Sequence, residues 1–462
     1  MDDLSQAFGD VPVITDRTAV RRRSRDYFWY SPILKAELDG CFGDIVVAPR
    51  GEADVVSALR TCYARDVPVT VRGGGTGNYG QAVPLKGGVI LEMKGLDRIE
   101  WMRPGRVRAG AGVNIGVLEK ACRDAVGGEL RMFPSTMRLA TIGGYIGGGS
   151  SGIGSVTWGL LRDPGNLVAA RVVTMEAEPQ IVELRGRDVQ QVNHAYGTNG
   201  VITALELPLA PAVEWVDLLV AVPDVMDAVH LGRALAEQPG IQKRLVSLVA
   251  APVPKDYFEA LARGLDRDRH ALLLMIARED VETAERLVGE VAGAEVAYRS
   301  DRDGAPGIDP IFEYAWNHTT LRALKYDRSI TYLQVLFSGP DRWRGVEESF
   351  RVFGDEVPMH LEYINFGDHI GCFGLQLLRY TTAARLREIM DWFDARGFPV
   401  FDPHAYTLEG GGMKQVDPVQ LAFKHRADPK GLLNPGKMIG WDDPDYGGVR
   451  KPARYMYAAD PA

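Results

Sequence analysis

Few side chains in this sequence are suited to accept a proton, and one histidine stands out among them. The chain has eight histidines, and His404 lies in a segment, 401–414, that also holds Glu409 and a run of three glycines. Histidine and carboxylate are the groups that act most often as general acids and bases. We predict that His404 or Glu409 is a catalytic base and that Tyr406, in the same segment, contacts the substrate. A loop histidine bound to backbone is the structural alternative.

A second histidine, His318, belongs to a polar segment with helical spacing. Arg322 and Tyr326 follow it at intervals of four residues, so in a helix the three side chains would share one face. Arg322, with the neighbouring Lys325, would give that face the positive charge that binds a substrate carboxylate. We predict His318 as a further catalytic candidate and Arg322 and Lys325 as substrate contacts. A solvated helix surface explains the same pattern equally well.

Alternating polar residues mark a predicted strand farther along the chain. His360, Glu362, Tyr363 and Asn365 are spaced so that His360 and Glu362 point to the same side. We predict Tyr363 and Asn365 as substrate contacts. A histidine and a carboxylate on one side are also the ligands of many metal sites.

A run of glycines could bind an anion through the backbone. A predicted strand, 67–72, leads into Arg72-Gly73-Gly74-Gly75-Thr76-Gly77-Asn78. Successive N–H groups in such a loop can form an anion-binding nest, and without Cβ atoms the backbone can approach a diphosphate closely. Arg72 either supplies charge or braces the loop. The spacing matches neither the Rossmann fingerprint nor the P-loop, and a flexible turn would explain the triplet alone.

A second glycine-rich stretch makes a simple turn a poor explanation. It holds Pro134, Ser135, Thr141, Gly143, Gly144, Gly148, Gly152 and Ser155. Predicted strands separate it from the first loop, and it would form a second backbone-lined surface. The glycine-rich region ends at Gly197, Gly200, Val201 and Ile202, where a further predicted strand begins.

The order of these motifs resembles a known flavoprotein family. RGGGT is followed by PST, TIGG and WG, then by GTNGVIT, and LLNPGK stands near the C-terminus. This order is similar to that of the vanillyl-alcohol-oxidase and p-cresol-methylhydroxylase (PCMH) superfamily. Within it, the sequence resembles the glycolate-oxidase-subunit and D-lactate-dehydrogenase type of FAD-linked oxidases. The resemblance covers 39–211 and 400–440 well and the middle of the chain loosely.

The resemblance implies FAD as the cofactor and assigns roles to the glycine-rich stretches. Residues 72–78 would hold the pyrophosphate, and 134–155 would line the flavin and its ribityl or phosphate part. Residues 197–202 would meet the adenosine end through the backbone. Asn434 and Lys437 would close over the isoalloxazine ring from the C-terminal segment.

Three departures from the family pattern bear on the chemistry. Thr76 stands where members that tether FAD have a histidine, and 133–152 contains no cysteine, so we predict non-covalent FAD. Glu409 is followed by glycine, whereas the D-lactate-dehydrogenase type carries an EHGIG segment at about this place, so the choice between His404 and Glu409 stays open. Residues 367–369 (Gly-Asp-His) are only a fragment of that type's metal-binding pattern, and we predict no metal site.

The resemblance also implies an enzyme that oxidises a CH–OH group. We expect hydride transfer to flavin N5 from a 2-hydroxy acid or a small polar alcohol. A sugar, a phenolic alcohol or a natural-product intermediate is the alternative substrate class, and an interaction module that has lost its flavin site is a third interpretation. The electron acceptor would be O2, a dye, a quinone or a protein, and the chain could form a homodimer.

An α+β framework must position these residues. The spacing of apolar residues predicts strands at 44–48, 67–72, 89–93, 106–109, 168–175, 181–184 and 271–276. It predicts helices at 52–65, 115–125, 224–237, 281–291, 342–353 and 383–396. Helices that alternate with strands after residue 211 indicate helices packed on an antiparallel sheet.

Four parts of the chain follow from these patterns and the resemblance. We expect an N-terminal segment 1–38, a two-subdomain FAD-binding PCMH-type domain 39–211, an α+β substrate (cap) domain 212–399 with an antiparallel sheet, and a C-terminal segment 400–462 that returns to the flavin. In the N-terminal segment, Tyr27, Phe28 and Trp29 are expected to pack rather than to line a site.

The composition is that of a globular protein and excludes several classes of function. Of 462 residues, 46% are hydrophobic and 25% charged, and the formal net charge is −8. An acidic chain lacks the basic face of a nucleic-acid-binding protein. No apolar stretch has the length of a membrane span, and the N-terminus has no signal-peptide pattern. The four cysteines form no CxxC pair, so we expect free thiols in a cytoplasmic protein.

Overall fold

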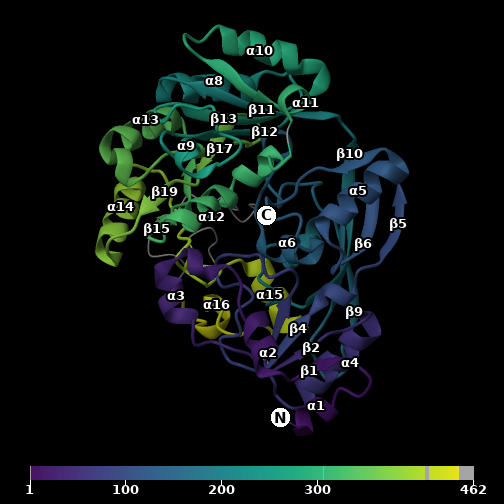
Figure 1. Cartoon of the computed structure of the whole chain (residues 1–462). Helices are drawn as coiled ribbons and strands as arrows, with labels where there is room; N and C mark the ends of the chain where they lie inside the picture. The colour runs from purple at the N-terminus through teal and green to yellow at the C-terminus, as the bar shows by residue number, and fades with distance from the viewer. Residues whose placement is uncertain (1, 305, 412–415, 447–462) are drawn as a thin grey trace.

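Two α+β lobes share the chain, one drawn below the other in Figure 1. The structure is a computed structural model that describes residues 2–304, 306–411 and 416–446. The lower lobe holds most of the first half of the chain, and the upper lobe holds most of the second half. A large antiparallel sheet lies in the upper lobe, so the predicted α+β fold class is confirmed.

A four-stranded sheet supports the glycine loop in the lower lobe, in the order β1-β2-β4-β3. Its strands are β1 (Val13–Ile14), β2 (Ile45–Val47), β4 (Val89–Glu92) and β3 (Val69–Arg72). Strands β2, β4 and β3 are parallel, and β1 is antiparallel. Helix α4 (Glu52–Ala64) connects β2 to β3 and buries Val55, Ala58, Leu59 and Cys62. The glycine loop begins where β3 ends.

A six-stranded antiparallel sheet completes the lower lobe, in the order β5-β6-β10-β8-β9 with β7 paired to β10. Its strands are β5 (Ile99–Arg103), β6 (Arg106–Gly110), β7 (Gly128–Leu130), β8 (Ala169–Val173), β9 (Ile181–Arg185) and β10 (Val201–Pro211). Helix α5 (Ile115–Val126) begins at Asn114, whose side chain accepts from Val117 N, and ends at Gly127 with φ of 60°. This left-handed turn favours glycine.

The second glycine-rich stretch forms a helix, α6 (Ile142–Gly148), that its composition does not predict. Glycine weakens a helix because it has more backbone freedom to lose. The helix is held by its surroundings instead: Thr141 Oγ1 accepts from Gly144 N at 3.3 Å, and Ile142, Tyr145 and Ile146 are buried in the core of the lobe.

A seven-stranded antiparallel sheet forms the centre of the upper lobe, in the order β14-β11-β13-β12-β17-β18-β16. Its strands are β11 (Trp215–Val222), β12 (Lys243–Val249), β13 (His270–Ala277), β14 (Glu295–Arg299), β16 (Val335–Phe337), β17 (His360–Asn365) and β18 (Ile370–Gly374). Strands β15 (Ile330–Tyr332) and β19 (Leu377–Arg379) form a separate pair.

Side chains along the strands of the large sheet point alternately to its two faces, and each face packs into a different hydrophobic core. Val216, Leu218 and Val220 of β11 join a core with helices α8 (Val225–Glu237), α10 (Val281–Gly289), α13 (Arg342–Phe353) and α14 (Ala383–Ala395). Leu219 and Ala221 of the same strand join the core of the lower lobe. The two lobes therefore share one continuous core below the sheet.

A buried arginine ties the sheet to the lower lobe. Arg244 on β12 donates from Nη1 to Glu119 Oε1 at 3.0 Å and from Nη2 to Leu130 O at 2.6 Å. Its Nη1 also lies 3.4 Å from Glu129 Oε2. Charged groups buried this deeply need such partners, because desolvation alone would be strongly unfavourable.

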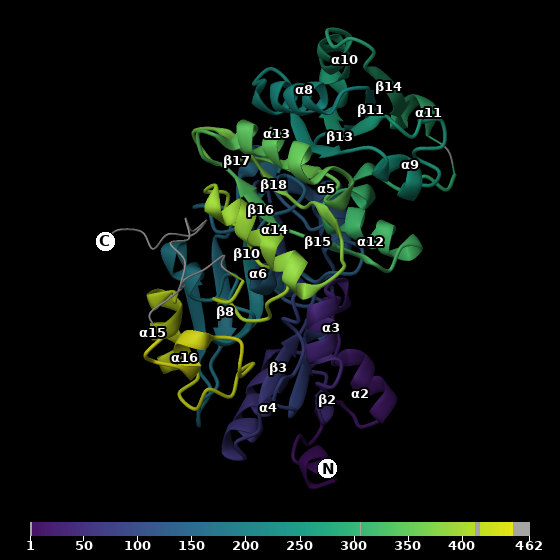
Figure 2. The same cartoon turned by 90° about the vertical axis from the view of Figure 1, so that its left-hand side faces the viewer.

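Both ends of the described chain pack on the lower lobe. Val69 N donates to Leu432 O and Asn434 N donates to Val69 O, each at 2.8 Å, so the C-terminal segment extends the four-stranded sheet beside β3. Figure 2 shows α15 (Pro418–Ala427) and α16 (Ile439–Asp442) on this side of the lobe. Near the N-terminus, Tyr30 O accepts from Thr331 Oγ1 of the upper lobe at 2.7 Å.

Shorter elements complete the fold. They are α1 (Asp2–Gln6), α2 (Arg17–Arg23), η1 (Phe28–Tyr30), α3 (Pro32–Leu38), η2 (Met93–Gly95), α7 (Ser155–Trp158), η3 (Gly186–Gln191), α9 (Val253–Tyr257), η4 (Arg278–Asp280), α11 (Ser300–Asp303), η5 (Ile311–Tyr314), α12 (Asn317–Tyr326) and η6 (Gly354–Glu356). Across the described part of the chain, no helix has both the length and the apolar character needed to cross a bilayer.

Candidate functional site

A cavity with about 1580 Å³ of empty space, counting its opening to solvent, runs between the glycine-rich stretches and the upper lobe. Predicted residues line most of its lower wall: Gly73, Gly74, Gly75, Thr76, Gly77, Asn78, Pro134, Ser135, Thr141, Gly143, Gly144, Gly148, Gly152, Gly197, Gly200 and Ile202. Three stretches far apart in sequence thus form one surface. The lining continues from this surface to Trp316 and Asn317 of the upper lobe, so one ligand could contact both lobes.

The first two glycine stretches touch each other closely. A Cβ on Gly73 would overlap the Thr141 hydroxyl and lie 3.5 Å from Gly144 Cα, and a Cβ on Gly74 would lie 3.0 Å from Ala140 Cα. Only glycine permits this approach, because backbone atoms on the opposite side cannot move aside. The loop and α6 therefore form a single backbone-lined wall.

Open space at two glycines of α6 shows where a ligand could lie against this wall. Gly147 and Gly148 both line the cavity. A Cβ on Gly147 would meet no atom within 4 Å, and one on Gly148 would meet only the Gln81 side chain at 3.6 Å or more. The residues present thus fit a flat ligand such as a flavin, since the wall is smooth and without side chains at these positions.

Arg72 braces the loop from behind, which is one of the two roles predicted for it from the sequence. Its Nη1 donates to Arg25 O at 2.6 Å, and its guanidinium occupies the space into which a Cβ on Gly75 would project. Burial lowers the pKa of Arg72. The N-terminal segment holds the other end of the loop, because Tyr27 N donates to Gly77 O at 2.7 Å.

Asn434 and Lys437 also support the lower wall without lining the cavity. Asn434 Nδ2 donates to Gln81 O at 2.8 Å and to Tyr196 O at 2.6 Å, and so joins two of the lining segments. Lys437 is fully buried, and its Nζ donates to Gly80 O at 2.6 Å. These contacts position the backbone that the cavity exposes.

Two buried charges lie close to each other behind the loop. Burial lowers the pKa of Lys437 to about 7, although the nearby Asp26 carboxylate opposes the shift. Burial likewise raises the pKa of Asp26 to about 6, although N–H groups of Ala82 and Phe28 and the charges of Lys437 and Arg72 oppose it. Asp26 lines the cavity, so this pair brings titration near neutral pH to the wall itself.

Two further predicted cofactor residues act through their neighbours. Ser155 Oγ accepts from Gly152 N at 3.0 Å and fixes the turn that lines the cavity. Val201 is buried in the core around β3 and α4, while its neighbours Gly200 and Ile202 reach the cavity. Alternation along β10 accounts for this difference.

The upper wall of the cavity is aromatic and polar. Its residues are Tyr27, Tyr30, Trp316, Asn317, Gln334 and Leu375, with Tyr79 from the lower lobe. Tyr79 OH donates to Gln334 Oε1 at 2.5 Å, and burial raises the pKa of Tyr79 to about 12. The expectation that Tyr27 only packs in the N-terminal segment is wrong, because this segment passes over the glycine loop.

The predicted bases near the C-terminus lie outside the cavity lining. His404 is buried, its Nδ1 contacts Ser31 Oγ at 2.8 Å, and burial lowers its pKa. Tyr332 packs against the His404 ring, with ring centroids 6.3 Å apart. Glu409 accepts from Ile439 N at 2.8 Å and from Gly440 N at 3.1 Å, so its carboxylate is engaged at the start of α16.

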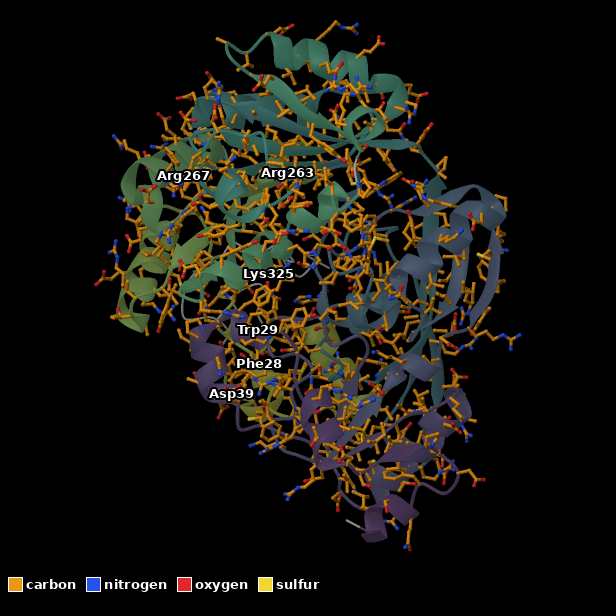
Figure 3. All side chains as sticks on the ribbon, in the orientation of Figure 1. Phe28, Trp29, Asp39, Arg263, Arg267 and Lys325 are labelled. Atoms are coloured by element: carbon orange, nitrogen blue, oxygen red, sulfur yellow. The ribbon has the colours of Figure 1, made fainter. Side chains whose placement is uncertain are left out.

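The predicted face of α12 exists, but its positive charge is already paired. His318 Nδ1 lies 2.7 Å from Glu313 Oε2. Arg322 donates to Asp309 Oδ2 at 2.8 Å and to Glu313 O at 2.7 Å. Lys325 is exposed on the part of α12 that lies beside η1, near Trp29 (Figure 3). The helix reaches the cavity through its first residue instead.

The remaining predicted substrate residues point elsewhere. Tyr363 is buried beneath α8, and its OH donates to Val229 O at 2.8 Å. Asn365 Nδ2 donates to Thr157 O at 3.3 Å. The Tyr406 ring lies below Lys437, with Nζ 4.9 Å from the ring centroid. None of the three lines the cavity.

His360 and Glu362 do point the same way, and they brace the upper wall. His360 Nε2 lies 2.8 Å from Glu362 Oε1, and both side chains are fully buried. Glu362 Oε1 accepts from Trp316 N at 2.6 Å, and His360 Nδ1 lies 3.1 Å from Leu375 O. Within residues 2–304, 306–411 and 416–446, no group of three or more His, Cys, Asp or Glu side chains is arranged to hold a metal ion.

Sequence reasoning missed most of the upper wall, and little in the sequence could have found it. Trp316 and Asn317 directly precede the predicted His318, so the segment was recognised but not its lining residues. Gln334 and Leu375 are single residues beside short strands, without motif or periodicity.

Known proteins share both the sequence motifs and the fold. A family model described as an FAD binding domain matches residues 43–184. D-lactate dehydrogenase of Archaeoglobus fulgidus is 28% identical over 86% of this chain and 91% of its own length. Glycolate oxidase subunit GlcD of Bacillus subtilis is 28% identical over 40% of this chain, and the match spans 41% of the relative's length.

A solved structure extends the likeness to nearly the whole chain. Alkyldihydroxyacetonephosphate synthase superposes with a TM-score of 0.69 and 16% identity, covering 95% of this chain and 85% of the other. At this identity the likeness establishes the fold alone. The chain therefore carries an FAD-binding domain of the PCMH type and is related to the FAD-linked oxidoreductases that include glycolate oxidase subunit GlcD and D-lactate dehydrogenase.

Proposed function

We propose that the protein is an FAD-linked oxidoreductase that oxidises a CH–OH group of a small molecule. One observation carries the proposal: a single cavity joins a glycine-lined wall, fit for a dinucleotide, to an aromatic and polar wall made by the upper lobe together with Tyr27, Tyr30 and Tyr79. Substrates bind at lobe interfaces in many enzymes, because two rigid surfaces can be positioned independently. The relatives named as glycolate oxidase and D-lactate dehydrogenase support the same reaction class.

The chain's own residues would bind and orient the cofactor through backbone groups. Residues 73–77, 141–148 and 197–202 supply this surface, with Arg72 and Asn434 holding it in shape. FAD, when bound, supplies a two-electron acceptor for the hydride of a substrate C–H bond. The rings of Tyr27, Tyr30 and Trp316 would exclude water from the second part of the cavity.

We propose that FAD is held without a covalent bond. Thr76 lines the cavity and accepts from Thr136 Oγ1 at 3.3 Å. A threonine hydroxyl is a weaker nucleophile than a histidine imidazole or a cysteine thiolate, so Thr76 is poorly suited to form a bond to the flavin. The cavity lining contains neither histidine nor cysteine among the described residues.

None of the three bases predicted from the sequence lines the cavity, and we favour His318 because it is the one that directly follows a lining residue. Its pairing with Glu313 at 2.7 Å orients the imidazole as an acid–base catalyst requires. Its neighbour Asn317 lines the cavity. By contrast, the Tyr332 ring packs against His404, and Glu409 accepts a hydrogen bond from Ile439 N at the start of α16. Replacement His318→Gln should lower kcat by roughly 10²–10⁴-fold and leave the FAD content unchanged.

Turnover with an artificial dye acceptor tests the proposal. The purified holoprotein is assayed with 2-hydroxy acids, simple alcohols and sugars, and dye bleaching is followed under nitrogen and in air. We expect dye reduction with at least one member of the CH–OH panel. A flavin-loaded protein that reduces dye with none of them would contradict the reaction class. Turnover in air without dye that is faster than dye reduction under nitrogen would identify O2 as the electron acceptor, rather than a quinone or a protein.

A further inference from the structure

The turn 196–200 borders the cavity among elements of the lower lobe. Its residues Tyr196, Gly197, Asn199 and Gly200 belong to the lining. A Cβ on Gly197 would contact Val71 of β3, and one on Gly200 would overlap Val172 of β8. The flavin ring of FAD must meet the substrate where both lobes line the cavity, so this turn would contact the opposite end of the cofactor, its adenosine monophosphate (AMP) half.

Apolar side chains line the cavity beside this turn. They belong to Met93, Ala111, Val192 and Ile202. Ile202 lies two residues after Gly200, and Ala111 N donates to Thr203 O of the same strand, β10, at 2.9 Å. Ligand sites combine such apolar walls with a few polar groups that fix the orientation of the ligand. An adenine ring would find the apolar wall here, and the backbone of the turn supplies the polar groups.

A buried amide behind the wall sets the direction of the peptide between Tyr196 and Gly197. Asn434 is 1% exposed, and its Nδ2 donates to Tyr196 O at 2.6 Å. The C=O and N–H groups of a trans peptide point in opposite directions, so the Gly197 N–H group points away from Asn434. Gly197 N makes no hydrogen bond with any described residue, and Gly197 is partly exposed where it borders the cavity. A ligand in the cavity can therefore accept from this N–H group.

The backbone of Tyr196 is strained in this arrangement. Its φ of 54° lies in the left-handed region, which bulky L-residues rarely adopt. Hydrogen bonds fix the backbone on both sides, because Tyr196 N donates to Gly147 O at 2.8 Å and Tyr196 O accepts from Asn434. Strain of this kind is kept at functional sites, where the direction of the backbone matters.

A buried lysine of α15 holds the next peptide of the turn. Lys424 is 2% exposed, and its Nζ donates to Thr198 O at 2.9 Å and to Asp428 Oδ2 at 2.8 Å. Asp428 also accepts from Leu433 N at 2.8 Å, directly before Asn434. The buried ion pair thus fixes both the turn and the residue that orients it.

We propose that Asn434 and Lys424 are positioning residues, which turn the Gly197 N–H group into the cavity to hold the AMP half of FAD, and that the C-terminal segment 418–437 thereby selects FAD over FMN. Both residues act through the backbone of the turn and touch no ligand themselves. This inference rests on the cofactor named in the proposed function and adds the part of the chain that recognises its far end.

Binding of FAD and FMN to the full-length, flavin-free protein tests the proposal. FMN has the isoalloxazine ring, the ribityl chain and one phosphate of FAD but lacks the AMP half. Dissociation constants are measured from changes in flavin fluorescence for the unaltered protein and for Asn434→Gly, which removes the amide but tolerates the φ of 41° at this position. The FAD dissociation constant should rise about five- to tenfold more than the FMN dissociation constant. Equal changes for the two flavins, or no change for FAD, would overturn the proposal.

A second variant tests the role of the lysine. Lys424→Met combined with Asp428→Asn removes the donor to Thr198 O without leaving an unpaired buried carboxylate. Lys430→Met is the matched control, because Lys430 Nζ also donates to a backbone carbonyl, Tyr63 O, at 3.0 Å but lies outside the lining. The double variant should weaken FAD binding about fivefold and leave FMN binding unchanged, whereas the control should alter neither. Equal FAD affinity in the double variant and the control would contradict the role of Lys424.

The binding data also separate this inference from the proposed function. An unaltered protein that binds neither flavin would refute both. A protein that binds FAD but oxidises no CH–OH compound would refute the reaction class only. An FMN affinity too low to titrate in the unaltered protein would support selection by the AMP half, and the FAD affinities of the double variant and its control then decide the role of the turn.

Discussion

Replacement Gly147→Ala should stabilise the protein without FAD and weaken its binding of FAD. Gly147 lies in α6, lines the cavity and has no atom within 4 Å of its virtual Cβ. Alanine in such a position raises the free energy of unfolding by about 0.4–1 kcal/mol, chiefly because the unfolded chain has less freedom. If the flavin lies against α6, the added methyl group must overlap it.

The size of the FAD effect follows from the cost of overpacking. An extra methyl group in a packed environment costs about 1–3 kcal/mol, which corresponds to roughly 5–150-fold weaker FAD binding. The flavin-free protein is compared by chemical denaturation, and FAD affinity is measured by quenching of flavin fluorescence. The two measurements should move in opposite directions.

Gly289→Ala is the matched control for this change. Gly289 ends α10, and its virtual Cβ also meets no atom within 4 Å, but it is remote from the lining. The control should show a similar gain in stability and unchanged FAD affinity. Unchanged FAD affinity in Gly147→Ala, together with increased stability of the flavin-free protein, would refute the placement of the cofactor against α6.

Three further predictions test other parts of the site. Acid precipitation should release all FAD into the supernatant, because Thr76 replaces a tethering histidine; flavin retained in the pellet would contradict this. Burial raises the pKa of Asp26 to about 6 from 3.8, so the folded state favours the protonated carboxyl. This contribution to the free energy of unfolding is complete below pH 3.8 and is lost as the pH rises through 6. The stability of Asp26→Asn relative to the unaltered protein should therefore rise mainly between about pH 4 and 6 and level off above about pH 7, by up to about 3 kcal/mol in total; a constant or falling difference in denaturant unfolding would contradict it. Glu362→Ala should lower the free energy of unfolding by about 3–5 kcal/mol, because His360 and Trp316 N lose their acceptor; a loss below about 1 kcal/mol would show that the pair does not hold the wall.

The lower wall was predictable because it depends on one residue type. Backbones can approach each other this closely only at glycine, and the glycine-containing segments 73–77 and 197–200 can be recognised directly in the sequence. The same composition hid α6, since glycine disfavours helices and tertiary contacts with Ala111 and Gly73 override that preference. Local propensity could not reveal contacts between segments far apart in sequence.

Side-chain direction was less predictable than location. Arg72 and Lys437 lie beside the cavity as their motifs indicate, yet both contact backbone behind the wall. Arg322 has the predicted helical position, but Asp309, from a loop that no pattern connects to it, takes its charge. A motif gives the neighbourhood of a residue, and the partners that orient it come from elsewhere in the fold.

The upper wall shows the limit of sequence reasoning most clearly. Trp316, Gln334 and Leu375 come from three separate segments of the upper lobe. Their convergence depends on the register of the seven-stranded sheet and on a strained backbone at Trp316. Neither feature leaves a periodic signal in the chain.

Absorbance at about 450 nm, where oxidised flavin absorbs, tests the central claim most directly. The purified protein is mixed with CH–OH compounds, neutral and acidic, in the absence of oxygen. The account predicts a yellow protein whose 450 nm band bleaches with at least one of these compounds. A colourless protein that does not take up FAD, or a flavin band that no CH–OH compound bleaches, would contradict it.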